Sequence, residues 1–440
     1  MNWSVSSEVL VASQPPPRPA VVIFTASALA IALTAGFGLG VWLLLARTAG
    51  LSTFGVPWVV LVQVHGTIQL FGFAALFVMG VALHVLPRFR GAATPPRIVT
   101  WVTFCGTVGA IVLRAVAQPL IDLPGRDLFL GLSSILLVAA TSSFAVGALV
   151  ALRGGTNPHR PDELVMAAGI LAAPLAAILV AVGMPLSGAS LLVDPSAEDR
   201  AVWAMLLGSL STIIFGVWAR LASGFVASPP ARPRRLLPAA ALWLAGAAGL
   251  VTDVPFAALP LVVGLCALAW ALGVFGPSIA RQRLPAHART TLLAVRSAFV
   301  WALVGAVLLA LYQVRAAVTG SEASYLEVSA ARHSFALGFV TIMIYGVAAR
   351  ALPSFTDRQL WSLRLHIVTI ALANAGVALR VAPQAIGADG AFVSGVVGLS
   401  GIVAYLALVT FAVNMLRTVR GPAVRQRTRG APVPIVARID

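Results

Sequence analysis

Residues 65–89 read HGTIQLFGFAALFVMGVALHVLPRF and place a histidine and a glutamine inside a segment otherwise apolar enough to span a membrane. His65 and Gln69 are four residues apart, so they share one face of a helix, and Gly72 and Gly80 lie on the same face. Such a face could seat a flat cofactor, or it could let two helices pack closely. The rest of the chain has to decide between these two interpretations.

The composition is that of a polytopic membrane protein. Of 440 residues, 59% are hydrophobic and only 10% are charged, and the mean hydropathy is +0.96, whereas soluble domains contain about 25% charged residues. A net charge of +16 would suggest nucleic acid in a soluble chain, but membrane topology accounts for most of these arginines, so we expect no nucleic-acid partner. Cys105 and Cys266 both lie in apolar segments, which excludes a disulfide framework and a CxxC motif.

Twelve apolar segments are long enough to cross a hydrocarbon core of about 30 Å as helices. They lie at about 20–47, 57–86, 98–120, 128–152, 164–186, 201–226, 236–252, 255–280, 291–317, 329–353, 364–386 and 390–416. The arginines are concentrated after the even-numbered segments, so the positive-inside rule predicts that both termini are cytoplasmic. We expect residues 1–19 to form a disordered cytoplasmic N-terminus, and residues 417–440 a basic cytoplasmic tail that contacts membrane lipid.

An internal repeat organises these segments. Gly72, Gly80 and His84 recur with the same spacing as Gly208, Gly216 and Arg220, and again as Gly338, Gly346 and Arg350. The offset between the first and third copies also matches Leu113-Arg114 with Leu379-Arg380. The fold class we predict is therefore an all-α polytopic membrane protein of about twelve transmembrane helices. They form three four-helix repeats, at about 20–152, 164–280 and 291–416, with approximate threefold symmetry.

Four ionisable residues inside the predicted spans are candidates for a functional site, because such groups are costly in lipid. His65, Arg114, His333 and Arg380 lie on four helices at similar depth, in the outer third of the membrane. A neutral imidazole can ligate haem iron, and a guanidinium can bind a propionate bidentately. This layer predicts a haem site, with Gln69 as a further hydrogen-bond donor. The simpler alternative is that His65 links two helices and that the arginines extend to the interface.

Two groups of residues carry a resemblance to a known family. The first comprises residues 65–66, Gln69, 71–73, 77–80 and 87–88, and the second comprises Arg332, His333, Gly338, Met343 and Arg350. They resemble the signature region of the NnrS family, twelve-helix membrane proteins that contain haem and copper and are linked to bacterial tolerance of nitric oxide and nitrosative stress. The resemblance also makes the chain similar to the catalytic subunits of haem-copper oxidases and nitric oxide reductases.

The resemblance implies that His65 and His333 are metal ligands, that haem is a cofactor and that the chain lies in the bacterial inner (plasma) membrane. It also implies copper, for which we identify no ligands, and nitric oxide or another small gas as a ligand. Residues 353–358 read PSFTDR, where family members carry a Gly-His-Thr-Gly-Arg-like run. The predicted sixth and seventh spans contain no histidine, so the histidine cluster of an oxidase copper centre cannot be assembled, which argues against dioxygen reduction.

The two histidines are not copies of each other, because the repeat that relates Gly72 to Gly338 aligns His65 with Ala331 and His333 with Thr67. Either one haem is held between spans 2 and 10, or the histidines serve different haems. We expect a haem-binding protein of the nitric oxide response, with Arg114 and Arg380 holding propionates, that acts by gas binding or as a haem-dependent oxidoreductase with an unidentified redox partner. The alternatives are a cofactor-free transporter of an anionic solute and an assembly factor for a respiratory complex.

Overall fold

A computed structural model describes residues 20–120, 122–184, 192–229, 231–276, 284–387 and 390–422, and all regular structure in these ranges is helical. The elements are α1 (Ala20–Ile31), η1 (Ala32–Gly36), α2 (Phe37–Ala49), α3 (Trp58–Thr67), η2 (Ile68–Ala75), α4 (Leu76–Arg90), α5 (Arg97–Ala117), α6 (Arg126–Arg153), α7 (Pro161–Val182), α8 (Pro195–Trp203), η3 (Ala204–Ser211), α9 (Thr212–Val226), α10 (Pro233–Val251), α11 (Ala258–Ala271), α12 (Ala286–Thr319), α13 (Tyr325–His333), η4 (Ser334–Thr341), α14 (Ile342–Phe355), α15 (Leu363–Ala385) and α16 (Ala391–Arg420), where η marks a π-helix.

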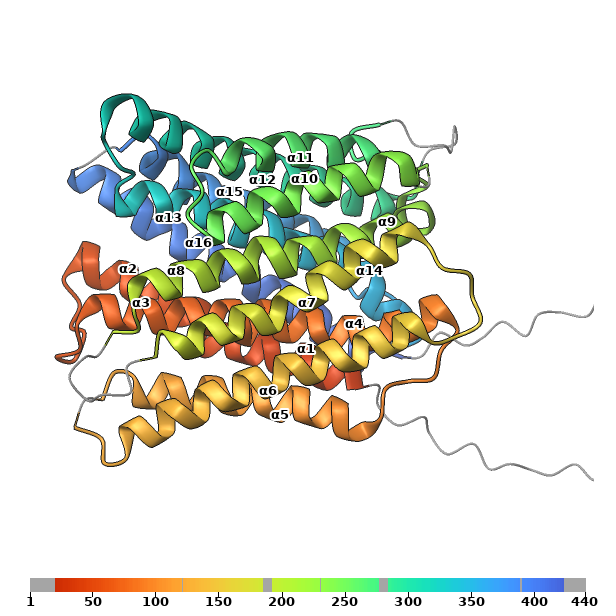
Figure 1. The fold of residues 1–440 in the computed structure, drawn as a ribbon, viewed down its shortest axis with the longest axis horizontal. Helices are drawn as coiled ribbons and strands as arrows, with labels where there is room; N and C mark the ends of the chain where they lie inside the picture. The colour runs from red at the N-terminus through yellow and green to blue at the C-terminus, as the bar shows by residue number, and fades with distance from the viewer. Residues whose placement is uncertain are drawn as a thin grey trace, which may run out of the picture.

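The helices run side by side as one bundle, which confirms the predicted all-α membrane fold (Figure 1). Within the described ranges, eleven continuous helical segments are long and apolar enough to cross a membrane. The predicted span at 255–280 is the exception, because its described part contains only the 14-residue helix α11. Gly273 follows with a φ of 63°, a left-handed conformation that ends helices.

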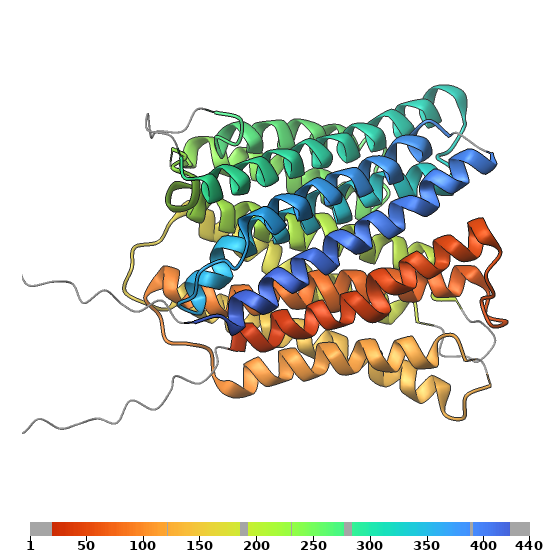
Figure 2. The same cartoon turned by 180° about the vertical axis from the view of Figure 1, so that it is seen from behind.

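The beginning of α1 and the end of α16 lie at the same end of the bundle, called the terminal end below; the opposite end is called the far end (Figure 2). Residues 1–19 and 423–440 are outside the described residues, so the two disordered termini stay predictions. Helix α16 extends to Arg420, so residues 417–420 of the predicted tail are helical.

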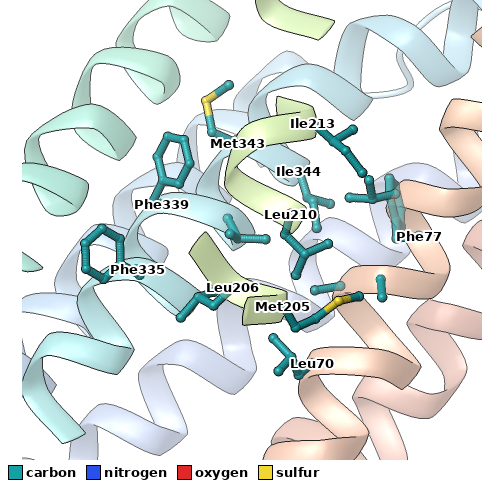
Figure 3. Packing of buried hydrophobic residues seen from close by; sticks show 14 of the residues in the cluster. Leu70, Phe77, Met205, Leu206, Leu210, Ile213, Phe335, Phe339, Met343 and Ile344 are labelled. Carbon is teal, nitrogen blue, oxygen red and sulfur yellow. The ribbon is translucent and has the colours of Figure 1, made fainter. Parts of the chain in front are cut away.

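Three long helical segments form the interior of the bundle. In these segments 78–89% of the most apolar 18-residue stretch is buried, against 33–50% in the other eight spans. The three segments are Trp58–Arg90, Pro195–Val226 and Tyr325–Phe355. Each contains a π-helix of the same length, η2, η3 or η4, and the three begin at equivalent positions of the sequence repeat. Each π-helix contacts the other two, and Figure 3 shows their apolar side chains meeting at the centre. Three repeats therefore surround one central axis.

Side-chain hydroxyls support the altered backbone of two of the π-helices. Ser211 Oγ donates to Leu206 O at 2.7 Å, and Thr341 Oγ1 donates to Ala336 O at 2.8 Å, each reaching back five residues. In an α-helix such a hydroxyl reaches the carbonyl three or four residues back, so the five-residue reach reflects the wider π turn.

The repeated glycines provide close packing within each repeat. A Cβ atom on Gly80 would lie 2.2 Å from Phe24 of α1, and one on Gly216 would lie 2.4 Å from Met166 of α7. Gly346 in α14 is packed in the same way, against α12. Each inner helix thus contacts the first helix of its own repeat through a glycine. This agrees with the packing interpretation of these glycines and leaves no room for a macrocycle against them.

Candidate functional site

His65 lies in α3, seven residues after Trp58 and so about 10 Å from the far end of that helix. Its Nδ1 atom is 3.0 Å from the carbonyl oxygen of Gly36. Gly36 is the last residue of η1, a π-helix within the first span, and its φ of −81° and ψ of −96° turn the backbone out of the α-helical pattern. The turn therefore presents a carbonyl to the imidazole, which α-helical geometry would keep inside the helix.

Glycines of the first span allow it to pack closely against the His65 ring and Gln69. A Cβ atom on Gly40 would lie 2.6 Å from His65 Cε1, and one on Gly36 would lie 3.0 Å from Gln69 Oε1. Any larger residue at Gly40 would displace the ring. The Oε1 atom of Gln69 is buried without a hydrogen-bond partner.

His333 is the last residue of α13 and has a matching arrangement. Its Nδ1 atom is 2.7 Å from the carbonyl oxygen of Ser329. Because a carbonyl only accepts, Nδ1 must carry the proton in both histidines, and the lone pair is then on Nε2. Among the residues that the structure describes, neither His65 Nε2 nor His333 Nε2 has a hydrogen-bond partner. Both rings are thus prepared as neutral ligands through Nε2.

Arg380 of α15 completes this group. His65 and His333 lie within electrostatic range of Arg380 and of each other, so the three side chains lie in one region. The guanidinium of Arg380 has two buried nitrogens, Nε and Nη1, without hydrogen-bond partners. An unsatisfied buried donor costs about 1–3 kcal/mol, so this group has the chemistry of a site for an anion. We call His65, Gln69, His333 and Arg380 the Arg380 cluster.

Arg114 belongs to a different group. Its Nε donates to Gln118 Oε1 at 2.8 Å, and its Nη2 donates to Glu198 Oε1 at 3.1 Å. Gln118 in turn donates to Gln63 at 2.8 Å, and Gln63 exchanges two hydrogen bonds with the backbone of Val193. We call Arg114, Gln118, Gln63 and Glu198 the Arg114 cluster. The structure therefore brings together three of the four predicted layer residues and pairs the fourth with a carboxylate.

Glu198 was missed from the sequence because hydropathy places the start of the sixth span at residue 201. The helix begins at Pro195, and the carboxylate of Asp194 accepts from the amide of Ala197 at 2.8 Å as its N-cap. An aspartate followed by proline is a recognised helix start. Glu327 was missed for the same reason, because hydropathy places the start of the tenth span at residue 329. The helix begins earlier, where Ser324 and Glu327 form a capping box. These local signals predict the helix starts better than hydropathy does.

No group of three His, Cys, Asp or Glu side chains within the described ranges could hold a metal ion. His366, at the terminal end of α15, is buried with both ring nitrogens unpartnered. It lies fourteen residues before Arg380 on the same helix, which is about 21 Å away along its axis.

Comparison with known proteins identifies the fold. No protein-family model and no curated protein matches this chain. A haem-copper terminal oxidase, solved as a dimer by cryo-electron microscopy, matches with a TM-score of 0.68 and 12% sequence identity, over 94% of this chain and 88% of that one. At this identity the likeness is one of fold alone. The chain is a multi-pass membrane protein of a haem-copper oxidase-like fold.

Proposed function

We propose that this chain binds one haem between α3 and α13, where His65 and His333 would hold the iron and Arg380 would bind a propionate. The observation that carries the proposal is the Arg380 cluster itself. Two histidines with free Nε2 atoms lie in one region of the bundle with a guanidinium that has two unpartnered nitrogens. Ligand nitrogens and an anion partner are what a haem with its propionates requires.

The residues around the histidines fit this role. A metal-ligating histidine usually donates its other N–H to a carbonyl or carboxylate, which fixes its tautomer and orientation. Gly36 O and Ser329 O serve as these acceptors. The two carbonyls belong to different helices, so each ring is oriented independently of the other. Arg114 is left out of the proposed site, because Glu198 and Gln118 already bind it.

Two protein ligands on one iron favour electron transfer, and the bound haem would supply one-electron chemistry. The one-haem arrangement is favoured over two separate haems because His65 and His333 lie in the same region of the bundle. The resemblance of the region around these histidines to the NnrS family then supports redox handling or binding of nitric oxide in the nitrosative stress response. We assign no residue to copper.

The arginines support an orientation in the membrane. We propose that the chain lies in the bacterial inner membrane with its terminal end in the cytoplasm. The last turns of α4 and α16 at that end carry Arg88, Arg90, Arg417 and Arg420, as the positive-inside rule expects. The Arg380 cluster then lies near the opposite, outer surface, within reach of an electron donor or of a gas on that side.

A spectrum of the purified protein tests the proposal. After expression with adequate haem supply we expect a Soret band and the spectrum of a haem with two nitrogen ligands. Replacing His65 or His333 by alanine should convert it to the spectrum of a haem with one protein ligand, or should remove the haem. A colourless protein would contradict haem binding and favour a transporter.

A matched control uses another buried histidine. His366→Asn replaces a ring that is more buried than His65 or His333 and lies far along α15 from Arg380. We expect its spectrum to equal that of the unmodified protein. If His366→Asn loses the haem while His65→Ala keeps it, the site lies in another part of the bundle.

A further inference from the structure

The terminal end of the bundle carries a ring that closes around the central axis. Arg220 of α9 lies 5.2 Å from the ring centre of Phe89 in α4, and Arg350 of α14 lies 5.2 Å from that of Phe225 in α9. The His84 ring of α4 lies 4.5 Å from that of Phe355 in α14. Each basic residue therefore stacks on a phenylalanine of a neighbouring inner helix. The three contacts link α4 to α14, α14 to α9 and α9 back to α4, which closes the ring.

The ring follows the internal repeat. The same two offsets that relate His84 to Arg220 and Arg350 also relate Phe89 to Phe225 and Phe355. We call the first three residues the basic ring. Because all three contacts recur at equivalent positions, the ring is a feature of the repeat unit. It is separate from the Arg380 cluster, in which only Arg380 has an equivalent of its own type, Arg114.

An apolar cavity of about 70 Å³ lies between the same three helices. Its walls include three valines at repeat-equivalent positions, Val81, Val217 and Val347, each three residues before a member of the basic ring. Figure 3 shows residues that line the cavity farther from the ring, namely Phe77, Ile213, Met343 and Ile344. The cavity has room for about five water-sized groups, but its apolar walls offer water no partners, so an aliphatic occupant is favoured.

The charges at the ring are unequal. Arg220 lies 3.5 Å from Asp162 and 3.8 Å from Glu163, two buried carboxylates at the start of α7. Arg350 donates to Gly224 O at 3.3 Å, and no carboxylate pairs with it among the described residues. Arg350 therefore keeps an uncompensated charge and free N–H donors one helical turn from the cavity wall.

We propose that the cavity and Arg350 form a binding site for a fatty-acid anion, with the aliphatic chain passing between Val81, Val217 and Val347 and the carboxylate on Arg350. Burying the chain is favoured by about 25 cal/mol per Å² of apolar surface. A charge-assisted hydrogen bond to Arg350 would fix the head group. The site lies about 24 Å along the inner helix from His65, so it is independent of haem binding.

Binding of dodecanoate to the purified full-length protein in maltoside detergent tests this proposal, with dodecanol as the uncharged probe. Val347→Phe fills the cavity and should abolish binding of both probes. Arg350→Gln should weaken dodecanoate by at least about tenfold and leave dodecanol unchanged, because only the charged head is affected. The matched controls are Val263→Phe on the exposed face of α11 and exposed Arg234→Gln in α10, which should bind as the unmodified protein does.

Several outcomes would overturn the site. Equal dodecanoate binding by the unmodified protein and Arg350→Gln would exclude Arg350 as the head-group partner. Displacement of dodecanoate by vesicles of phosphatidylglycerol would assign the cavity to lipid instead of to a fatty acid. If Val347→Phe does not fold, Val347→Leu fills less of the cavity and should still weaken both probes. The haem spectrum is recorded for each variant, so loss of haem is distinguished from loss of this site.

Discussion

Arg114 and Arg380 occupy equivalent positions in the first and third repeats, yet their surroundings are opposite. Arg114 is bonded to Glu198 and Gln118 and keeps one buried nitrogen, Nη1, without a partner. Arg380 keeps two, Nε and Nη1, and no carboxylate pairs with it among the described residues. The repeat explains the difference. The position of Glu198 in the second repeat corresponds to Val62 in the first, so the helix equivalent to the one that carries Glu198 offers Arg380 no carboxylate at this position.

The same two positions can be compared once more, between the second and third repeats. The position of Arg114 and Arg380 is held there by Leu250, and the position of Glu198 and Val62 is held in the third repeat by Val328. One scaffold thus gives an arginine paired with a carboxylate, two apolar residues at the equivalent positions, and an arginine without a carboxylate. Only the last of these calls for a ligand, and the two histidines lie beside it.

The largest expected effect is on the Arg114 cluster. Glu198→Ala removes the carboxylate and leaves Arg114 buried and uncompensated, which should lower the free energy of unfolding by about 3–5 kcal/mol. Chemical denaturation in detergent solution measures it. Glu198→Gln keeps an acceptor for Arg114 and should lose less. Equal stability of Glu198→Ala and the unmodified protein would show that the ion pair is not formed.

Leucine substitutions of the two arginines should have effects of opposite sign in the haem-free protein. Arg380→Leu removes two unsatisfied donors and should raise the free energy of unfolding by about 1–3 kcal/mol. Arg114→Leu leaves Glu198 without its arginine and should lower the free energy. The same denaturation curves measure both. Destabilisation by Arg380→Leu would mean that Arg380 already has a partner in the haem-free state.

A carboxylate can also be moved from one repeat to the other. Val62→Glu places a carboxylate in the first repeat at the position that Glu198 occupies in the second. The new carboxylate should bind Arg380. Haem affinity should then fall about tenfold, which corresponds to about 1.4 kcal/mol, because the propionate has lost its partner. Haem titration followed by absorbance measures it, with Val62→Gln as the uncharged control. Unchanged affinity would exclude Arg380 as the propionate ligand.

The smallest expected effect concerns the start of α8. Asp194→Ala removes the N-cap that fixes the helix carrying Glu198, and should cost about 1 kcal/mol of stability. A shift of the thermal midpoint would report it. Asp194→Asn retains the capping oxygen and should be nearly silent, so equal losses in the two variants would indicate a role for the charge of Asp194.

The helices and their threefold repeat could be predicted from apolar periodicity and glycine spacing, which depend on local sequence. Of the site, the depth of Arg114 and Arg380 was predictable, because it follows from residue counts along a helix. The partner of each arginine could not be predicted, because it depends on which repeat packs against the helix that carries the arginine. The carbonyl of Gly36 was also out of reach, because the sequence does not show that the first span contains a π-helix.

The π-helices also bear on how the chain arose. A π turn holds one more residue than an α turn, so each can be understood as a single insertion into an ancestral α-helix. Three insertions at the same repeat position, in η2, η3 and η4, are simplest if the insertion came before the unit was triplicated. Within the described residues, η1 has no counterpart in α7 or α12 and is then a later event in one copy. The acceptor of His65 would date from that event, so the proposed ligand site would be younger than the scaffold that carries it.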